Sequence, residues 1–489
     1  MSWKMSFDQK EMFSLLYKLA RMSQPDTRIE YDEMGAIRVP LDRMYGPQTM
    51  RSVMNFPIGG VEERMPRPII VALGIIKKAA AQTNRQSGLE PLICDAIMKA
   101  SDDVISGKLY DENHFPLVIW QAGSGTSTNM NVNEVISNRA IEIMGGQVGS
   151  KEPVDAVGHV DMSQSCCDNF SSAINIAVVM QLNEKLFPSI KAFIEVLDNK
   201  EQEFKNIIKI ARTHLMDSEP MTLGNVFGGY KQMMINNSSR LDSCMQRLYE
   251  ISLNSEGCSC KSCSEDFGAG CISGIAELTG LPFVSAPNVF EAVSARDSLV
   301  ELHGELNSTV VSLMKIVSDV RLMASGPRCG FGELVLPEDA PGSSLMPDNV
   351  STRQCEVLTM ICAQVMGNQV AVSIGSSNGH FELNAFMPLI ASNVLRSIGL
   401  LSDGLNEFTN SCLKGIRANE KNIKKTLNES LIMAVPLQPY IGHDKAIEIA
   451  NLAYANGTTV KWEAYKKGLS NADLDNWLHV DKLLSFSYQ

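Results

Sequence analysis

The sequence predicts a mainly α-helical protein with a central bundle of long helices, and three observations support this fold class. Apolar residues recur at i, i+3, i+4 and i+7, the spacing of one helix face, in two stretches: Ile190, Phe193, Ile194 and Leu197, then Leu302, Leu306, Val310, Leu313 and Val317. Aromatic residues make up only 6% of the chain while it has 26 Met, which favours helical cores over a β-sandwich. Residues 353–374 are apolar nearly all round, which predicts a fully buried helix.

The elements are expected in the following order. Pro and Gly are frequent up to about residue 70, which predicts short segments and turns there, and helical periodicity begins afterwards. The stripe that begins at Ile190 is expected to continue through Phe204, Ile207 and Ile208. Breaks near Gly404 and Gly415 precede a smaller helical tail, in which Asn456-Gly457 is expected to form a turn.

Length and pattern together indicate several domains. With 489 residues the chain is too long for one compact core. We divide it into an N-terminal extension (1–26), an N-terminal domain (27–160), a central helical-bundle domain (161–415) and a small C-terminal helical domain (416–489). A helix that is apolar on all sides needs extra partners in a bundle, and oligomerisation is one way to supply them.

Charge and composition exclude several classes of protein. The net charge is −12, and an acidic chain without a basic stripe is a poor binder of nucleic acid. No run approaches 18 uninterrupted apolar residues, so we expect no membrane partner. The 12 Cys do not form a disulfide scaffold and are expected to be mostly reduced thiols.

Residues 1–26 contain four basic side chains among apolar ones, a pattern that suits a mitochondrial transit peptide. Asp8 and Glu11 count against it, because such peptides are poor in acidic residues. We therefore predict a mitochondrial protein and keep a cytoplasmic location as the alternative.

Four polar islands interrupt the helical pattern and could carry chemistry. Residues 123–131 (GSGTSTNMN) combine small residues, which let backbone N–H groups approach a ligand, with hydroxyls. Residues 163–168 (SQSCCD) offer further hydroxyls and two thiols, and residues 212–214 (RTH) offer a histidine that can act as a general base near neutral pH. Residues 342–351 (GSSLMPDNVS) could form a mobile loop of hydroxyl donors or only the cap of a helix.

Together these islands resemble the fumarase/aspartase superfamily and, within it, the class II fumarases. The resemblance runs from about Arg28 to the end of the chain, including segments 129–135 (NMNVNEV), 325–328 (SGPR) and 379–384 (GHFELN). Fumarases carry Thr-His where aspartases carry Thr-Gln, so His214 points to water rather than ammonia as the group that is added.

The resemblance implies a three-domain subunit and a homotetramer with a twenty-helix core, in which each active site takes residues from three subunits. It implies reversible hydration of fumarate to malate without any cofactor or metal. Ser343 would remove the C3 proton, and His214, oriented by Glu356, would handle the water. The substrate-binding set would be Ser124, Thr126, Asn129, Ser165, Cys166, Cys167, Thr213, Asn349 and Ser351.

The sequence departs from the family pattern where the ligand should bind. The family loop reads Gly-Ser-Ser-x-Met-Pro-Gly-Lys-Val-Asn-Pro, and here its Lys is Asn349 and its Asn is Ser351. The family Ser-Ser-Asn becomes Ser165-Cys166-Cys167, so another amide is lost. One lost preorganised donor typically costs about 10²–10³ in rate. Arg353 could restore the missing positive charge, or it could be an ordinary surface or interface arginine.

Three interpretations follow from these departures. The chain is a diverged fumarate hydratase with impaired activity, a catalytically silent fumarase-like subunit that assembles as a homotetramer or a mixed tetramer with an active relative, or a lyase with an altered substrate. The spacing of Cys258, Cys260 and Cys263 is typical of metal ligands. They could form a structural metal site or a redox-sensitive loop, or they could be plain substitutions in this segment.

Overall fold

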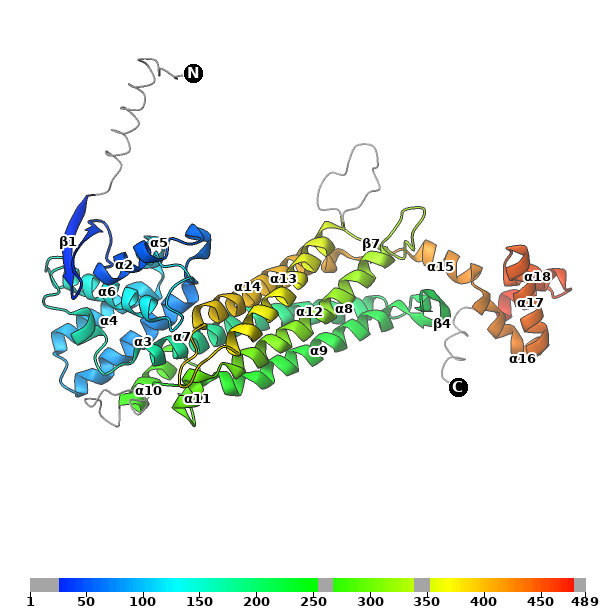
Figure 1. The fold of residues 1–489 in the computed structure, drawn as a ribbon. Helices are drawn as coiled ribbons and strands as arrows, with labels where there is room; N and C mark the ends of the chain where they lie inside the picture. The colour runs from blue at the N-terminus through cyan, green and yellow to red at the C-terminus, as the bar shows by residue number, and fades with distance from the viewer. Residues whose placement is uncertain (1–25, 254–266, 338–351, 479–489) are drawn as a thin grey trace, which may run out of the picture. The chain divides into compact units, whose positions relative to one another are not determined.

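The structure is a computed structural model that describes residues 26–253, 267–337 and 352–478 (Figure 1). Several sequence predictions fall outside these ranges and stay predictions. They concern the N-terminal extension up to residue 25, the cysteines Cys258, Cys260 and Cys263, and the loop residues Ser343, Asn349 and Ser351.

The chain folds into two compact units, each made of three separate segments. Unit 1 contains residues 1–181, 244–303 and 369–396, and unit 2 contains residues 182–243, 304–368 and 397–489. Four long helices have residues in both units: α9 (Leu223–Leu248), α12 (Asp297–Met323), α13 (Arg353–Ser376) and α14 (Met387–Ser411). The division into residues 27–160, 161–415 and 416–489 remains a prediction beside this grouping.

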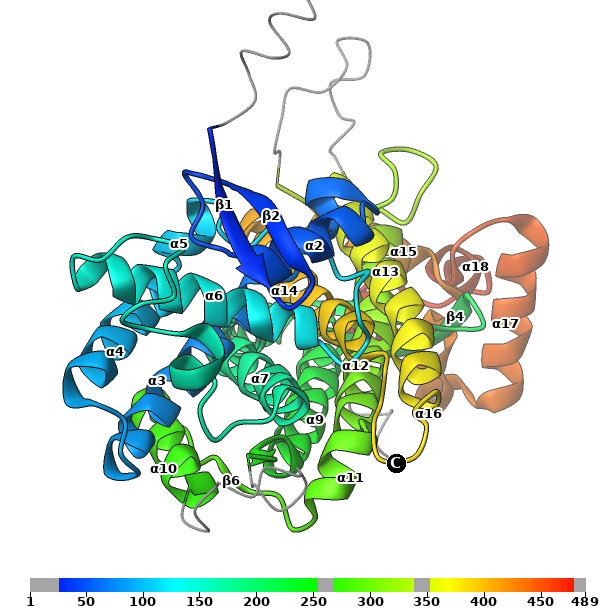
Figure 2. The same cartoon turned by 60° about the vertical axis from the view of Figure 1, so that its left-hand side comes forward.

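Unit 1 begins with an antiparallel hairpin, β1 (Thr27–Asp32) and β2 (Gly35–Pro40), which lies beside α2 in Figure 2. Its helices are α2 (Pro47–Asn55), α3 (Arg67–Gln86), α4 (Pro91–Ile105), α5 (Lys108–Asp111), α6 (Thr126–Ile143), α7 (Cys166–Gln181), α10 (Phe267–Thr279) and α11 (Val289–Ser294). Helix α3 packs against α4, α7 and α10. Two short strands, β5 (Glu250–Ile251) and β6 (Val284–Ser285), pair in parallel.

Unit 2 contains α8 (Phe187–Glu203) and the antiparallel hairpin of β3 (Ile208–Thr213) and β4 (Met216–Thr222). Strands β7 (Leu334–Val335) and β8 (Arg417–Ala418) also pair antiparallel. The remaining helices are α15 (Glu420–Glu429), α16 (Gln438–Ile441), α17 (His443–Asn456), α18 (Val460–Lys466) and α19 (Asn471–Trp477), most of them orange to red in Figure 1. As predicted, α17 ends at Asn456, and Gly457 follows in the left-handed conformation with φ 62°.

The predicted stripe of α12 is confirmed. Its five apolar residues, from Leu302 to Val317, are all fully buried. In α8, Ile190, Phe193 and Leu197 are likewise fully buried. A helix buries such a stripe because residues at this spacing lie on one face.

Two predicted boundaries are wrong. The helical stripe does not continue to Ile208, because α8 ends at Glu203 and Ile208 begins strand β3, which packs against the C-terminal core. A short apolar run of this kind cannot be assigned to helix or strand from periodicity alone. Nor does the chain break at Gly404, which lies inside α14: a Cβ there would come within 2.7 Å of Ile361, so the glycine allows α14 to approach α13.

The prediction that residues 353–374 are buried on all sides is also wrong for the single chain. One face of α13 is buried through Cys355, Leu358 and Val365, while Met360 and Val370 are 64% and 58% exposed. Within the described ranges, α13 is the one helix long and apolar enough to cross a bilayer, but a helix of a bundle core passes the same test of length and composition. In the described part of the single chain, no other element packs on this apolar face at Met360 and Val370.

Candidate active site

The first part of the site is the tight turn that leads into α6 in unit 1. Gly125 precedes α6 in the left-handed conformation with φ 75°. A Cβ on Gly125 would come within 2.1 Å of the Phe170 ring, and one on Gly123 within 1.6 Å of the Ala385 carbonyl oxygen. Only glycine fits at these two positions, so the turn is held close to α7 and places Ser124 and Thr126 at the start of α6.

Four side chains form a connected set, which we call the hydroxyl–thiol cluster: Ser124, Thr126, Cys166 and Cys167. The Ser124 and Thr126 hydroxyls lie 2.8 Å apart, and the Thr126 hydroxyl lies 3.3 Å from the Cys166 sulfur. The two sulfurs are 4.0 Å apart at the first turn of α7. The structure thus brings together four of the predicted substrate-binding residues from two islands about 40 positions apart.

A buried polar network lies next to this cluster. Asn129, which is fully buried, donates through Nδ2 toward the Asp161 carboxylate at 3.4 Å. Asp161 also forms an ion pair with the fully buried Lys77 at 2.5 Å, and Lys77 donates to Gln164 Oε1 at 3.0 Å. Asn169 donates to Asn129 at 3.2 Å. These hydrogen bonds and the ion pair link α3, α6 and α7 around the cluster.

Two groups at the start of α7 have shifted pKa values. The hydrogen bond with Cys167, supported by Thr126 and opposed by burial, lowers the pKa of the Cys166 thiol to about 6. Burial, together with the neighbouring Cys166, raises the pKa of Asp168 to about 7. A thiol at a helix N-terminus is stabilised in its charged form by the helix dipole as well.

The second part of the site is the turn between β3 and β4 in unit 2. Thr213 is the last residue of β3, and His214 and Leu215 form the turn with φ 57° and 62°. Two successive positive φ angles match a two-residue hairpin turn, in which Asn and Gly are the favoured residues. His214 is exposed and Leu215 is 73% exposed, so the turn presents both side chains outward.

The base of this hairpin is anchored by a buried carboxylate. Glu333, which is 1% exposed, accepts from Arg212 at 2.8 Å and lies 3.2 Å from the Lys209 ammonium group. The Arg212 guanidinium also stacks on the Phe331 ring at 4.4 Å. These contacts position the strand from which Thr213 and His214 extend.

Glu356, predicted to orient His214, lies in the first turn of α13. Its carboxylate accepts from Arg321 at 2.8 Å and from the Thr352 hydroxyl at 3.2 Å. Within the described part of a single chain, no hydrogen bond joins His214 with Glu356. Their pairing stays a prediction.

Sequence reasoning missed the buried partners of the cluster. Lys77 lies on an otherwise apolar helix face, and a lysine at a core position of the helical pattern was the available signal. Its partner Asp161 is 84 positions away, so no local pattern could pair them. Ser165 precedes α7, and its carbonyl accepts from the backbone N–H of Asn169 at 2.9 Å.

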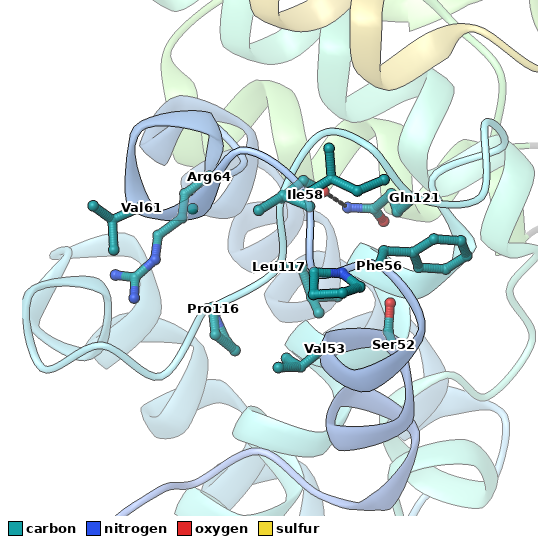
Figure 3. A pocket seen from close by; sticks show the side chains of 12 residues that line it. Ser52, Val53, Phe56, Ile58, Val61, Arg64, Pro116, Leu117 and Gln121 are labelled. Carbon is teal, nitrogen blue, oxygen red and sulfur yellow. Dashed lines mark hydrogen bonds between the residues drawn. The ribbon is translucent and has the colours of Figure 1, made fainter. Parts of the chain in front are cut away.

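The cavity in Figure 3 is a separate feature of unit 1. It has a volume of about 360 Å³ and is lined by residues from two segments, 52–64 and 116–121. None of the predicted site residues lines it. In the part of the chain that the structure describes, no group of three or more His, Cys, Asp or Glu side chains is placed to hold a metal ion.

Comparisons with known proteins identify the family of this chain. A family model described as lyase matches residues 35–367, and one described as fumarase C C-terminus matches residues 433–485. The mitochondrial fumarate hydratase of Homo sapiens is 52% identical over 468 residues, covering 95% of this chain and 91% of that protein. The chain belongs to the class II fumarases of the fumarase/aspartase lyase family.

Other relatives of this class II fumarase extend the likeness. The mitochondrial fumarate hydratase of Rhizopus oryzae is 48% identical over 472 residues, which is 96% of this chain and 95% of that protein. The crystal structure of class II fumarase from Schistosoma mansoni matches with a TM-score of 0.87 at 36% identity, covering 95% of this chain and 100% of that one. This fumarase is therefore mainly helical in the manner of its solved relatives.

Proposed function

We propose that this chain is a fumarate hydratase, a carbon–oxygen lyase of the tricarboxylic acid cycle that interconverts fumarate and malate. The observation that carries the proposal is the hydroxyl–thiol cluster, held by the glycine turn and the Lys77–Asp161 pair in a chain 52% identical to a fumarate hydratase. The hydroxyl donors Ser124 and Thr126, fixed at the start of α6, are suited to bind a carboxylate.

The chemistry would be divided among the two parts of the site and the loop. Ser343 would remove the C3 proton, and His214 would handle the water or the leaving hydroxyl. Ser124, Thr126, Asn129, Ser165, Cys166, Cys167 and Thr213 would surround the carboxylates, with Asn349 and Ser351 from the loop. Charge that develops on the substrate carboxylate in the transition state is stabilised by donors already aimed at it.

The proposal includes assembly into a tetramer. Supporting it is the exposed apolar face of α13, with Met360, Val370 and Ile374 each more than half exposed. The apolar area of such a face is removed from water when a second copy packs against it, which stabilises the association. Assembly would also let His214 of one chain meet Glu356 of another.

Impaired activity and a silent subunit are kept as alternatives, because the loop has Asn349 and Ser351 where the family has Lys and Asn. Arg353, the exposed first residue of α13, is the candidate for the missing positive charge. Asn349→Lys combined with Ser351→Asn and Cys167→Asn should raise the rate if the lost donors limit it.

The test is fumarate hydration by the purified full chain, followed as loss of fumarate absorbance, with Ser343→Ala as the control. Turnover well above this control supports a working hydratase. Turnover equal to the control, with no fumarate-induced rise in melting temperature, contradicts the proposal, because a ligand that binds the folded state must stabilise it.

The location proposed is the mitochondrion. The human, macaque and rat relatives are named as mitochondrial fumarate hydratases. A fusion of residues 1–26 to a fluorescent protein should enter mitochondria, whereas a uniformly cytoplasmic fusion would favour the alternative.

A further inference from the structure

A second cavity in unit 1 lies between α7, β5, α11 and the start of α12, and it contains none of the predicted site residues. Its volume is about 370 Å³, within the range of about 300–1,000 Å³ found for small-molecule sites. Eleven residues line it. Six of these side chains are charged, so the lining is unusually polar for so small a space.

Arg296 is the first sign that the cavity is built for a ligand. It is only 4% exposed and directly precedes α12. Its Nε donates to the Ala295 carbonyl at 2.5 Å, but its two terminal nitrogens have no hydrogen-bond or ion-pair partner among the described residues. Burial lowers the pKa of this guanidinium to about 10, which still leaves it charged at neutral pH. A buried guanidinium whose terminal nitrogens lack hydrogen bonds is costly even with the carboxylates of Glu291 and Asp297 nearby, and such groups are rarely kept without a reason.

Asn175 is the second sign, and it comes from a different element. Its side chain is 7% exposed, and Nδ2 donates to the Glu250 carbonyl at 3.0 Å, which fixes the amide orientation. The amide oxygen Oδ1 is buried and accepts no hydrogen bond from the described residues. The cavity therefore offers guanidinium donors at one point and a free acceptor at another.

The remaining charges decide what kind of ligand fits. Arg247 and Glu301 neutralise each other in an ion pair. Glu250, Glu291 and Asp297 are left against Arg296, so the lining has an excess of negative charge. A dicarboxylate would be repelled by these three groups. A ligand with no net charge, whose carboxylate meets Arg296 and whose ammonium group faces Asn175 Oδ1 and the acidic residues, satisfies all of them.

We propose that this cavity binds a free α-amino acid, with its carboxylate on Arg296 and its ammonium group on Asn175. This site goes beyond the hydratase function and is separate from the hydroxyl–thiol cluster. A guanidinium can hold a carboxylate through two parallel hydrogen bonds. The volume leaves room for a side chain beyond the backbone groups of glycine.

The experiment is isothermal titration of the full-length protein with glycine at millimolar concentration. Acetate carries only the carboxylate and methylamine only the ammonium group, so each should bind at least tenfold more weakly than glycine. Arg296→Gln should weaken glycine binding at least tenfold. The matched control is Arg247→Gln, which removes the other arginine of the cavity and should leave glycine binding within about twofold.

Further variants keep the proposal open to contradiction. Ser298→Phe fills the cavity without removing a charge and should also abolish glycine binding, which covers the case in which Arg296→Gln does not fold. Equal binding of acetate and glycine would overturn the amino-acid assignment, and so would equal losses in Arg296→Gln and Arg247→Gln. Any heat of malate binding that Arg296→Gln retains comes from the hydratase site. Loss of glycine binding in this variant therefore tests the cavity without testing the proposed hydratase function.

Discussion

The two parts of the candidate site are built in opposite ways. In unit 1 the hydroxyl–thiol cluster is tied to itself and bordered by the buried Lys77–Asp161 pair. In unit 2 His214 lies on an exposed turn with a positive φ, and the hairpin is held below the turn, through Glu333 on Arg212 and Ser430 on Asp217. The first part is preorganised by its own unit, whereas the second presents His214, the proposed catalytic group, outward. We infer that the second part is completed by contacts that a single chain lacks.

The largest effect should come from the outward-facing part. His214→Asn should lower kcat for fumarate hydration by about 10²–10⁴, the usual loss when a general acid or base is removed. Asparagine tolerates the left-handed conformation, so the melting temperature should stay within about 2 °C of the unchanged protein. Steady-state kinetics and thermal unfolding of the same preparation check both statements. A kcat within threefold of the unchanged protein would show that His214 does not act in the reaction.

Substitutions in the unit 1 part of the site should change the free energy of unfolding. Lys77→Met leaves the Asp161 carboxylate without its cation and should cost about 3–5 kcal/mol in the free energy of unfolding. Lys78→Met is the matched control on the same helix, because its partner Asp102 is largely exposed, and it should cost at most about 1 kcal/mol. Equal losses in denaturant unfolding would contradict the network around Lys77 and Asp161.

The thiols give a pH-dependent prediction. Because the pKa of Cys166 is lowered to about 6, its alkylation by iodoacetamide should have a midpoint near pH 6 instead of about 8.5, the usual value for a free thiol. Because the folded state favours the thiolate, the lowered pKa stabilises the folded protein. This stabilisation is complete above about pH 8.5 and is lost as the pH falls through 6.

Peptide mass spectrometry across pH 5–9 measures this midpoint. Cys167→Ala removes the largest cause of the shift and should move the midpoint upward. The same midpoint near 8.5 in both proteins would mean that the two sulfurs do not interact.

The smallest effect concerns the turn itself. Leu215 is 73% exposed with φ 62°, a conformation that costs a non-glycine residue about 1–2 kcal/mol. Leu215→Gly should therefore stabilise the protein by up to about 1 kcal/mol after the entropy cost of glycine. Leu215→Val should destabilise it, because β-branched residues fit this region poorly. The free energies of unfolding of the two variants should differ in this order, and the reverse order would argue against the turn.

Much of the fold could be predicted from periodicity, because a buried helix face leaves a regular stripe such as the one from Leu302 to Val317. Periodicity failed where contacts between residues far apart in the sequence decide the local structure. Ile208 belongs to a strand that packs on the C-terminal core, and Gly404 lies within a helix because Ile361 approaches it closely. The exposed face of α13 was not predicted, because an apolar composition does not distinguish a face buried within one chain from a face left for a second copy.

The candidate site could be predicted only in part. The islands around Thr126 and Cys166 do come together, as the resemblance to fumarases implies. Lys77 and Asp161 were not predicted, because an ion pair across 84 positions leaves no local pattern. The cavity at Arg296 was also not predicted, because arginine is usually exposed and its burial here is visible only in the structure.

The most direct test of this two-part site is complementation between two inactive variants. Thr126→Val damages the hydroxyl–thiol cluster and His214→Asn damages the turn, so each alone should have little hydratase activity. If the two parts of one site come from different chains, co-expressed variants that assort at random should recover about a quarter of the unchanged activity. Activity no higher than that of either variant alone, in mixed tetramers shown to have formed, would contradict a site shared between chains.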